Sequence, residues 1–391
     1  MDFWAKLLVI GVLVMGLRAQ LDGSLTIQER CERYGFGYEE YQVTTEDGYI
    51  LTLMRIPYSP DNPSTENRPP VLMVHPLNAD SAAMVGEGPD FSPAFSLSNR
   101  GFDIWLNNFR YTSYSRAHTT LDPDTDQEYW DFDIVDLRHD LMAEIMFILN
   151  NTNYDSLATY SYSFGGVTTA FAMALEPEFF EPRINLAGLM VTPVSLAHSN
   201  SILLNLVAYL HPMMDYLRTH GMNVMMAYDS PMGEIGSMIC VPFPYLCDGL
   251  LSFVMGESDP TIDHLESVQN LMLSGAPATL QLFQHYVQSA RTQRVSQFDY
   301  GPQGNLERYG VEVPPLIPLE NTINRVALVN ADIDVAVTHE DMQWYADILG
   351  DLVVDWQYYP ISHSGLLGGD TDEYLTDLAE LYNAFQEPSD Q

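Results

Sequence analysis

The stretch from Leu157 to Leu175 constrains the fold of this chain more than any other. It reads LATYSYSFGGVTTAFAMAL: a short apolar run typical of a buried strand, a tight turn of small residues, and a run of helix-forming residues. A strand that turns directly into a helix is typical of sheets whose parallel strands are joined by crossover helices. The question is whether the serine-rich turn is a site or only a polar loop.

The same alternation of strand and helix recurs on both sides of this stretch. Short apolar runs at 69–75 and 101–108 end in polar loops, as buried parallel strands do, and residues 136–149 carry apolar side chains at helical spacing. The strand pattern returns at 324–332 and 353–360. The sequence therefore predicts an α/β fold with a mainly parallel central sheet.

Three further segments complete the predicted organisation. Alternating residues on both sides of Glu46-Asp47-Gly48 predict a β-hairpin. Strand signals fade over 195–315, where amphipathic, methionine-rich stretches predict a helical insertion, and a last helix is expected from Asp372 to Phe385. We therefore predict an α/β core formed by 20–194 and 316–391, interrupted by a helical cap.

The N-terminal residues predict export. Lys6 precedes an apolar run from Leu7 to Leu17 that is too short to span a bilayer, and Ala19 is a small residue suited to cleavage. We interpret 1–19 as a signal peptide and expect a secreted protein or one of a lysosomal or digestive lumen. No later segment has the length of a transmembrane helix.

The charge of the chain excludes some partners. Acidic residues number 53 against 16 basic ones, a formal net charge of −37, so nucleic acid and anionic membranes would be repelled. This charge suits an acidic or salty lumen, in which carboxylates are partly protonated or screened, but a lineage-wide bias explains it equally well.

With 391 residues, 46% of them apolar, the chain can bury a large core, and we expect a monomer.

The cysteines suggest one disulfide and no metal site. In an exported chain, Cys240 and Cys247 can close a small loop, which leaves Cys31 single. Neither cysteine nor histidine shows the spacing of a metal site, and no cofactor is expected. The sequon that starts at Asn150 predicts glycosylation on a surface loop.

Ser163 is a candidate nucleophile. A serine at a strand-to-helix turn needs small residues two positions before and after it, and Ser161 and Gly165 occupy those positions. The pattern alone is weak, because clusters of serine and glycine usually form loops.

Two late loops supply the partners that such a nucleophile needs. Asp334 follows one late strand and His363 the next, which gives the chain order Ser, Asp, His found in serine hydrolases with open α/β sheets. His363 would accept the proton of Ser163, and Asp334 would fix the imidazole tautomer. Asp332 remains an alternative on spacing alone. His75 ends an earlier strand, where the first oxyanion donor of such a fold is usually carried.

From Glu39 to Phe385 the chain resembles the acid lipases, the family of gastric and lysosomal acid lipases and their invertebrate relatives. The resemblance rests on TEDGYILTLMRIP, VHPLNADS, DIWLNNFRYTSYSRAH, DQEYWDFDIVDLRHDL, YSYSFGG, LSGAPATLQLFQHYVQ, ADIDVAVTHED and SHSGLLGG. It implies an α/β-hydrolase core with a helical cap that acts on fatty-acid esters of neutral lipids such as triacylglycerol and sterol esters. Its partner would be neutral lipid or a lipid-droplet surface.

The resemblance also assigns roles by position. Ser163 matches the family nucleophile, Asp334 the triad acid and His363 the triad base, while Leu77 and Phe164 match the backbone N–H donors of the oxyanion hole. The resemblance favours Asp334 over Asp332, because matching Asp334 to the triad acid also matches Asp341 to a later aspartate of the family. The two cysteines of the insertion resemble the cap disulfide pair.

The chain departs from the family pattern near the site. Ser161 replaces a glycine, Pro76 replaces a glycine and Phe164 replaces a glutamine, while Phe109 and Tyr111 are bulkier than the usual loop residues. Two alternatives to a lipase therefore stay open. One is a catalytically impaired homologue that only binds lipid, and the other is an esterase for smaller soluble esters.

Overall fold

The computed structural model describes residues 25–86, 88–201, 211–220, 222–225, 278–368 and 371–386. The predicted signal peptide at 1–19 and the predicted disulfide between Cys240 and Cys247 lie outside these residues. The same holds for much of the predicted helical cap.

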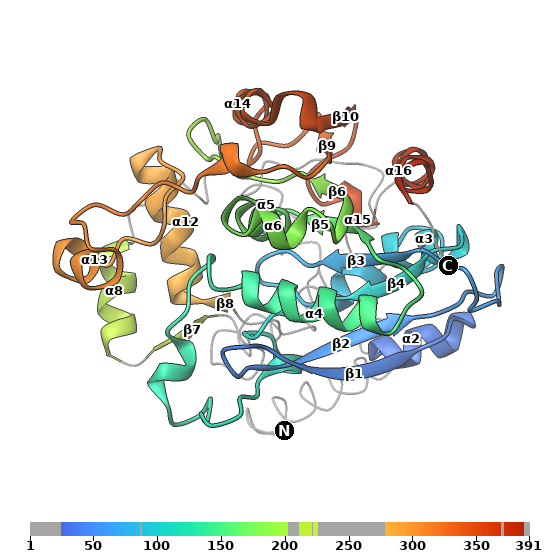
Figure 1. The fold of residues 1–391 in the computed structure, drawn as a ribbon, viewed down its shortest axis with the longest axis horizontal. Helices are drawn as coiled ribbons and strands as arrows, with labels where there is room; N and C mark the ends of the chain where they lie inside the picture. The colour runs from blue at the N-terminus through green and yellow to red at the C-terminus, as the bar shows by residue number, and fades with distance from the viewer. Residues whose placement is uncertain are drawn as a thin grey trace, which may run out of the picture.

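A twisted eight-stranded sheet forms the centre of the described chain (Figure 1). Its strand order is β1-β2-β4-β3-β5-β6-β9-β10. The pairs β1/β2 and β2/β4 are antiparallel, and every pair from β4 to β10 is parallel. The strands are β1 (Glu39–Thr44), β2 (Ile50–Ile56), β3 (Pro70–Val74), β4 (Asp103–Leu106), β5 (Leu157–Tyr162), β6 (Ile184–Met190), β9 (Val326–Ala331) and β10 (Val353–Tyr359).

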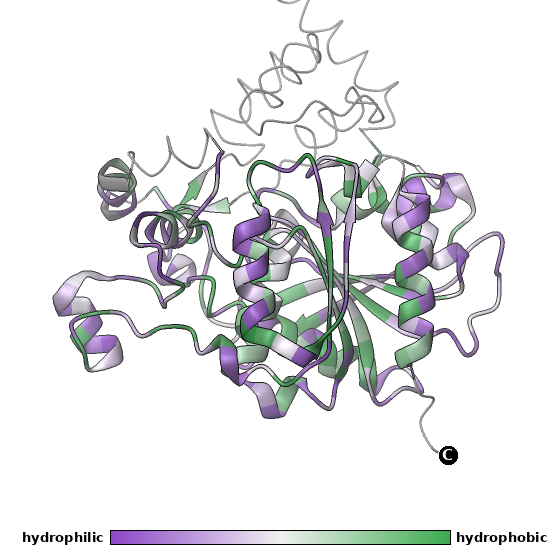
Figure 2. Cartoon of the chain, turned by 90° about the horizontal axis from the view of Figure 1, so that it is seen from above, coloured by the Kyte–Doolittle hydropathy of each residue, from purple (hydrophilic) through white to green (hydrophobic). Residues whose placement is uncertain are grey.

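Helices cover both faces of this sheet, and their apolar sides face it while their outer sides are polar (Figure 2). α4 and α5 pack together on one face and α3 and α16 on the other. The core helices are α2 (Ile27–Tyr34), α3 (Pro93–Asn99), α4 (Arg138–Asn150), α5 (Phe164–Leu175), α6 (Pro177–Phe180), α14 (His339–Leu349), α15 (Gly365–Gly368) and α16 (Asp372–Phe385). Short 3-10 turns lie at Ser81–Val85, Ser113–Ser115, Gln127–Trp130, Leu319–Asn321 and Gly350–Leu352.

The predicted α/β fold is confirmed. The hairpin forms with Thr44 opposite Ile50, and each predicted core strand and helix is present within a few residues of its expected bounds. The sequence analysis did not predict β6, although this strand is buried between β5 and β9. Its sequence, INLAGLM, includes small residues, and Gly188 is needed there because a Cβ would lie 2.5 Å from the Tyr382 hydroxyl and 2.7 Å from the Thr159 carbonyl oxygen.

The described part of 195–315 is mostly helical. It contains α8 (His211–Thr219), α12 (Leu280–Thr292) and α13 (Gly301–Tyr309), together with the short antiparallel pair β7 (Val224–Met225) and β8 (Ala278–Thr279). α12 packs against α8, and these helices lie to one side of the sheet (Figure 1). The boundaries of a separate cap stay a prediction.

Three other predicted features fall on described residues. Cys31 is free and buried, and burial raises the pKa of its thiol to about 12. The predicted glycosylation residue Asn150 is exposed at the end of α4. Among the described helices, none combines the length and the apolar character that crossing a membrane requires.

Candidate active site

The turn from 161 to 166, here called the elbow turn, holds Ser163 in a strained backbone conformation. Ser163 has φ 52° and ψ −113°, between the end of β5 and the start of α5, and its N–H donates to the Met190 carbonyl at 2.8 Å. A non-glycine residue at positive φ is uncommon and is often found at functional sites. With this backbone conformation, Ser163 belongs to neither the regular strand nor the regular helix and lies at a sharp turn between them.

Close packing explains the two glycines that follow Ser163. A Cβ on Gly165 would lie 2.4 Å from the carbonyl oxygen of Val74, and a Cβ on Gly166 would lie 1.9 Å from Oγ1 of Thr192. Both distances are far shorter than real contacts, so only glycine lets α5 approach the ends of β3 and β6. The elbow turn is therefore fixed mainly by steric fit.

The side chains of Ser161 and Tyr162 in the elbow turn fit this geometry. Ser161 is buried, and its hydroxyl lies 2.9 Å from that of Thr169, which also donates to the Gly165 carbonyl at 2.9 Å. The extra hydroxyl is therefore satisfied. The Tyr162 hydroxyl donates to the carbonyl oxygen of His363 and so ties the elbow turn to the loop of that histidine.

The structure brings Ser163, His363 and Asp334 together. Nε2 of His363 lies 3.0 Å from Oγ of Ser163, and Nδ1 of His363 lies 2.6 Å from Oδ2 of Asp334. Oδ1 of Asp334 accepts N–H bonds from Ala336 at 2.8 Å and Val337 at 3.0 Å. These bonds hold the carboxylate in place.

The same loop separates the two candidate aspartates. The Asp334 side chain is buried against His363, whereas Asp332 is exposed. With a carboxylate accepting from Nδ1–H, Nε2 is left to accept the proton of the serine hydroxyl. This arrangement can draw a proton from Ser163 and return it to a leaving group.

Two backbone N–H groups lie at the carboxyl ends of neighbouring strands. β3 pairs with β5 so that Val74 is opposite Ser161, and Leu77 and Phe164 follow these strand ends within three residues. Within the described residues, neither the Leu77 nor the Phe164 N–H has a hydrogen-bond partner. Phe164 also begins α5, where the helix dipole favours negative charge.

Aromatic side chains pack together beside the elbow turn. The Phe164 ring lies 6.3 Å from that of Phe109, 6.5 Å from that of Tyr111 and 5.6 Å from that of Tyr286 on α12, measured between ring centroids. The first three of these side chains are almost fully buried. The bulky residues noted in the sequence therefore form one apolar wall, and Tyr286 extends it to the insertion.

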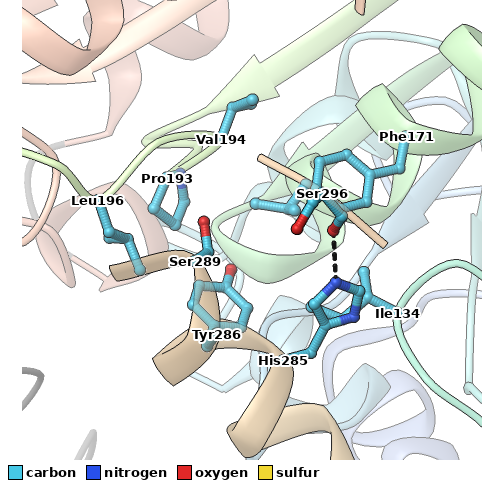
Figure 3. A pocket seen from close by; sticks show the side chains of 10 residues that line it. Ile134, Phe171, Pro193, Val194, Leu196, His285, Tyr286, Ser289 and Ser296 are labelled. Carbon is cyan, nitrogen blue, oxygen red and sulfur yellow. Dashed lines mark hydrogen bonds between the residues drawn. The ribbon is translucent and has the colours of Figure 1, made fainter. Parts of the chain in front are cut away.

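A small pocket continues this wall along α5 (Figure 3). Phe171 of α5, Val194 and Leu196 of the loop after β6 and Tyr286 of α12 surround the pocket in Figure 3, and Val167 also lines it. Sequence reasoning missed this pocket, because its wall on α12 lies more than 80 residues along the chain from the walls on α5 and the loop after β6. The one signal was the run of small and apolar residues in TTAFAMAL.

Buried ionisable groups gather around the loop from 75 to 80, here called the β3 loop. Burial lowers the pKa of His75 to about 4 and raises the pKa of Asp80 to about 7. Burial likewise raises the pKa of Glu144 to about 8, and Nδ2 of Asn107 donates to this carboxyl at 2.7 Å. Sequence reasoning singled out only His75.

Arg110 anchors the segment that packs on the β3 loop. Its guanidinium lies fully buried against Asp140, with Nη2 to Oδ1 at 2.6 Å, and also pairs with Asp47. Its backbone N–H donates to the same Asp140 carboxylate at 3.0 Å.

No cluster of three or more potential metal ligands occurs among the described residues.

Comparisons with known proteins show that the chain is similar to lipases. The family model "Partial alpha/beta-hydrolase lipase region" matches residues 27–87. The human protein "Lysosomal acid lipase/cholesteryl ester hydrolase" is 29% identical over 83% of this chain and 79% of its own length. Human "Lipase member K" is 27% identical over 84% of this chain and 82% of its own length.

The fold also matches solved structures. The esterase EaEST from Exiguobacterium antarcticum superposes with a TM-score of 0.52 over 89% of this chain and 99% of the esterase. At 12% sequence identity, this likeness concerns the fold alone.

Proposed function

Because this chain is an α/β-hydrolase related to the acid lipases, we propose that it is a lipase that hydrolyses fatty-acid esters of neutral lipids through an acyl-serine intermediate. The observation that carries the proposal is the chain of contacts from Ser163 Oγ through the His363 imidazole to the Asp334 carboxylate.

The proposed reaction has two halves. Oγ of Ser163 attacks the ester carbonyl while Nε2 of His363 takes the hydroxyl proton, and the Asp334 carboxylate stabilises the resulting imidazolium. The oxyanion accepts hydrogen bonds from the N–H groups of Leu77 and Phe164. His363 then protonates the leaving alcohol. A water molecule, deprotonated by His363, attacks the acyl-serine, and His363 returns that proton to Oγ of Ser163 as the fatty acid is released.

The surroundings of Ser163 support an apolar substrate. Phe109, Tyr111 and Phe164 pack as buried rings beside the elbow turn, and the small, mainly apolar pocket along α5 shares Tyr286 with this ring cluster. The formal net charge of −37 disfavours anionic lipid surfaces, so neutral lipid is the favoured partner.

The same rings favour one second candidate, an esterase for short soluble esters. Phe109 and Tyr111 are stacked with centroids 5.8 Å apart and fill space that a long acyl chain would need. Hydrolysis rates for p-nitrophenyl esters of increasing chain length separate the two candidates. A lipase prefers long chains and emulsified substrate, whereas a small-ester enzyme loses activity as the chain grows.

The first test is covalent labelling with a fluorophosphonate probe, followed by intact mass. We expect the wild type to take one label and Ser163→Ala to take none. Ser161→Ala is the matched control, because it removes the neighbouring hydroxyl without touching Ser163, and it should keep the label. A wild type that takes no label at any pH would favour the catalytically impaired homologue.

We further propose that the chain enters the secretory route. The apolar run at 7–17 and the exposed Asn150 support removal of 1–19 and addition of a glycan. Secreted protein whose mass drops on glycosidase treatment, but not in Asn150→Gln, would agree with this proposal. Intact N-terminal residues in the secreted protein would contradict it.

A further inference from the structure

His75 lies at the end of β3 with no exposure to solvent, and both of its ring nitrogens contact the backbone. Nδ1 lies 2.8 Å from the carbonyl oxygen of Pro76, and Nε2 lies 3.2 Å from the backbone nitrogen of Phe109. The rings of Phe109 and Tyr111 pack edge-on against the imidazole, with centroids 5.0 and 5.8 Å away.

These two contacts define the protonation state of the ring. A carbonyl oxygen can only accept, so Nδ1 must carry a proton, and a backbone N–H can only donate, so Nε2 must not. The neutral Nδ1–H tautomer alone satisfies both contacts. The depressed pKa of the buried ring agrees with this neutral form.

The accepting carbonyl belongs to the peptide group whose N–H is that of Leu77. A peptide group is planar and trans, so its N–H points opposite to its C=O. The ring of Pro76 fixes φ of that residue near −65°, which leaves ψ as the remaining rotation that aims the peptide. The bond from His75 to the Pro76 oxygen holds that rotation.

We propose that His75 is a positioning residue that aims the Leu77 N–H at the oxyanion by hydrogen bonding to the Pro76 carbonyl. This inference rests on the proposed function, since it assumes that Leu77 stabilises an oxyanion. It also explains how a proline is tolerated in place of the family glycine. The proline removes one rotation, and the histidine fixes the other.

The expected effect is smaller than the loss of an oxyanion donor, because Leu77 keeps its N–H. Deleting such a donor typically costs about 100- to 1000-fold in kcat. A donor that is present but free to turn should cost roughly 10- to 100-fold in kcat, with little change in KM, because the bond is needed in the transition state.

Three substitutions separate positioning from packing. In His75→Asn, the amide nitrogen takes the place of Nδ1 and can still donate to the Pro76 oxygen. In His75→Gln, the amide reaches the place of Nε2 and keeps only the Phe109 contact, and His75→Leu keeps neither. We expect Asn to retain kcat within about 5-fold, while Gln and Leu lose 10- to 100-fold at an unchanged KM for a soluble p-nitrophenyl ester.

If His75 has a purely structural role, the kcat values of the variants should follow their stabilities. Thermal unfolding of each variant is measured beside kcat. If kcat follows melting temperature, or if Asn is as slow as Leu although both are folded, His75 does not position the peptide. Equal kcat in the wild type and His75→Leu would also overturn the proposal.

A second readout does not depend on activity. Selective ¹⁵N labelling of histidine, with the His75 signals assigned by their loss in His75→Asn, should show the neutral Nδ1–H tautomer from about pH 5 to 8. The opposite tautomer overturns the proposal. If the wild type takes no fluorophosphonate label, the proposed function fails by itself, and the ring signals still decide whether His75 holds the Pro76 carbonyl.

Discussion

The elbow turn (161–166) and the β3 loop (75–80) end neighbouring strands of the sheet, yet different forces hold them. The elbow turn depends on steric fit, because Gly165 and Gly166 leave no room for a Cβ against Val74 and Thr192. The β3 loop depends on buried polar contacts, among which those of His75 are central. Glycines without side chains shape the elbow turn, whereas hydrogen bonds of buried side chains shape the β3 loop.

The two regions also differ in how they respond to pH. Burial raises the pKa values of Asp80 in the β3 loop and of Glu144, which accepts a hydrogen bond from Asn107 after β4, and lowers the pKa of His75. The hydroxyls of Ser161 and Thr169 hold the interior of the elbow turn and do not titrate. Packing changes should therefore damage the elbow turn, whereas charge changes should act on the β3 loop.

The largest effect is expected from Gly165→Ala. The added methyl would collide with the carbonyl of Val74, which cannot move without disrupting β3, so fluorophosphonate labelling should fall by about 100-fold or more. Gly310→Ala is the control, because it adds the same methyl where nothing lies within 4 Å. Its φ of 74° costs about 1 kcal/mol of stability but should leave labelling unchanged. Normal labelling of Gly165→Ala would show that the elbow turn is not sterically determined.

The next effect tests the polar support of the β3 loop. Arg110→Met should lower the free energy of unfolding by about 3–5 kcal/mol, because it leaves the buried Asp140 carboxylate without its guanidinium partner. The matched control is Arg116→Met, whose more exposed pair with Asp124 should contribute at most about 1 kcal/mol. Urea unfolding measures both changes. Equal losses would mean that burial of the first pair is not what supports this region.

The sequence revealed the sterically determined half of the site better than the polar half. Small residues around Ser163, and the Asp and His that follow late strands, form local patterns that a reader of one sequence can recognise. His75 was noticed only because of its place at a strand end. Its contact with Phe109 joins residues 34 apart, and nothing local in either segment indicates that they meet.

The elements of the fold were likewise predicted where the signal is local in the sequence. Strands and helices with clear periodicity were predicted, whereas β6 was missed because its run includes alanine and glycine and lacks bulky β-branched residues beyond Ile184. Its central place in the sheet is a tertiary property, set by packing between β5 and β9. The pocket along α5 was missed for the same reason, since α12 supplies one wall.

A moderate effect is expected from pH. The pKa of Glu144 is about 8, that of Asp80 about 7 and that of Asp136 about 6, all above their unfolded values, so the folded chain binds these protons more tightly. Their contribution to stability is present at low pH and is lost as pH rises through these values. His75 acts oppositely, because stability is lost as pH falls from 6.5 towards its folded pKa of about 4. Three carboxyls outweigh one imidazole, so the melting temperature should be several degrees higher at pH 5.5 than at pH 8.

Glu144→Gln tests the source of this pH dependence. The amide cannot ionise, so the variant's gain in stability over the wild type should be clearly larger at pH 8 than at pH 5.5. Thermal unfolding of both proteins at the two pH values gives the comparison. A wild type that is more stable at pH 8, or a variant with an unchanged pH dependence, would argue against buried carboxyls as the cause.

The smallest effect is expected at Ser161, where the elbow turn contains its one exchange of glycine for a side chain. Ser161→Gly introduces the glycine of the acid-lipase pattern but removes the hydroxyl bond to Thr169 and adds backbone freedom in β5, so unfolding should become easier by about 1 kcal/mol. Labelling of Ser163 should stay within about 3-fold, because Thr169 still donates to the Gly165 carbonyl and the glycines still set the turn. A large gain in labelling would mean that Ser161 holds the nucleophile in an unreactive position. The elbow turn would then owe its geometry to a polar contact as much as the β3 loop does, and the impaired homologue would become the better account of this chain.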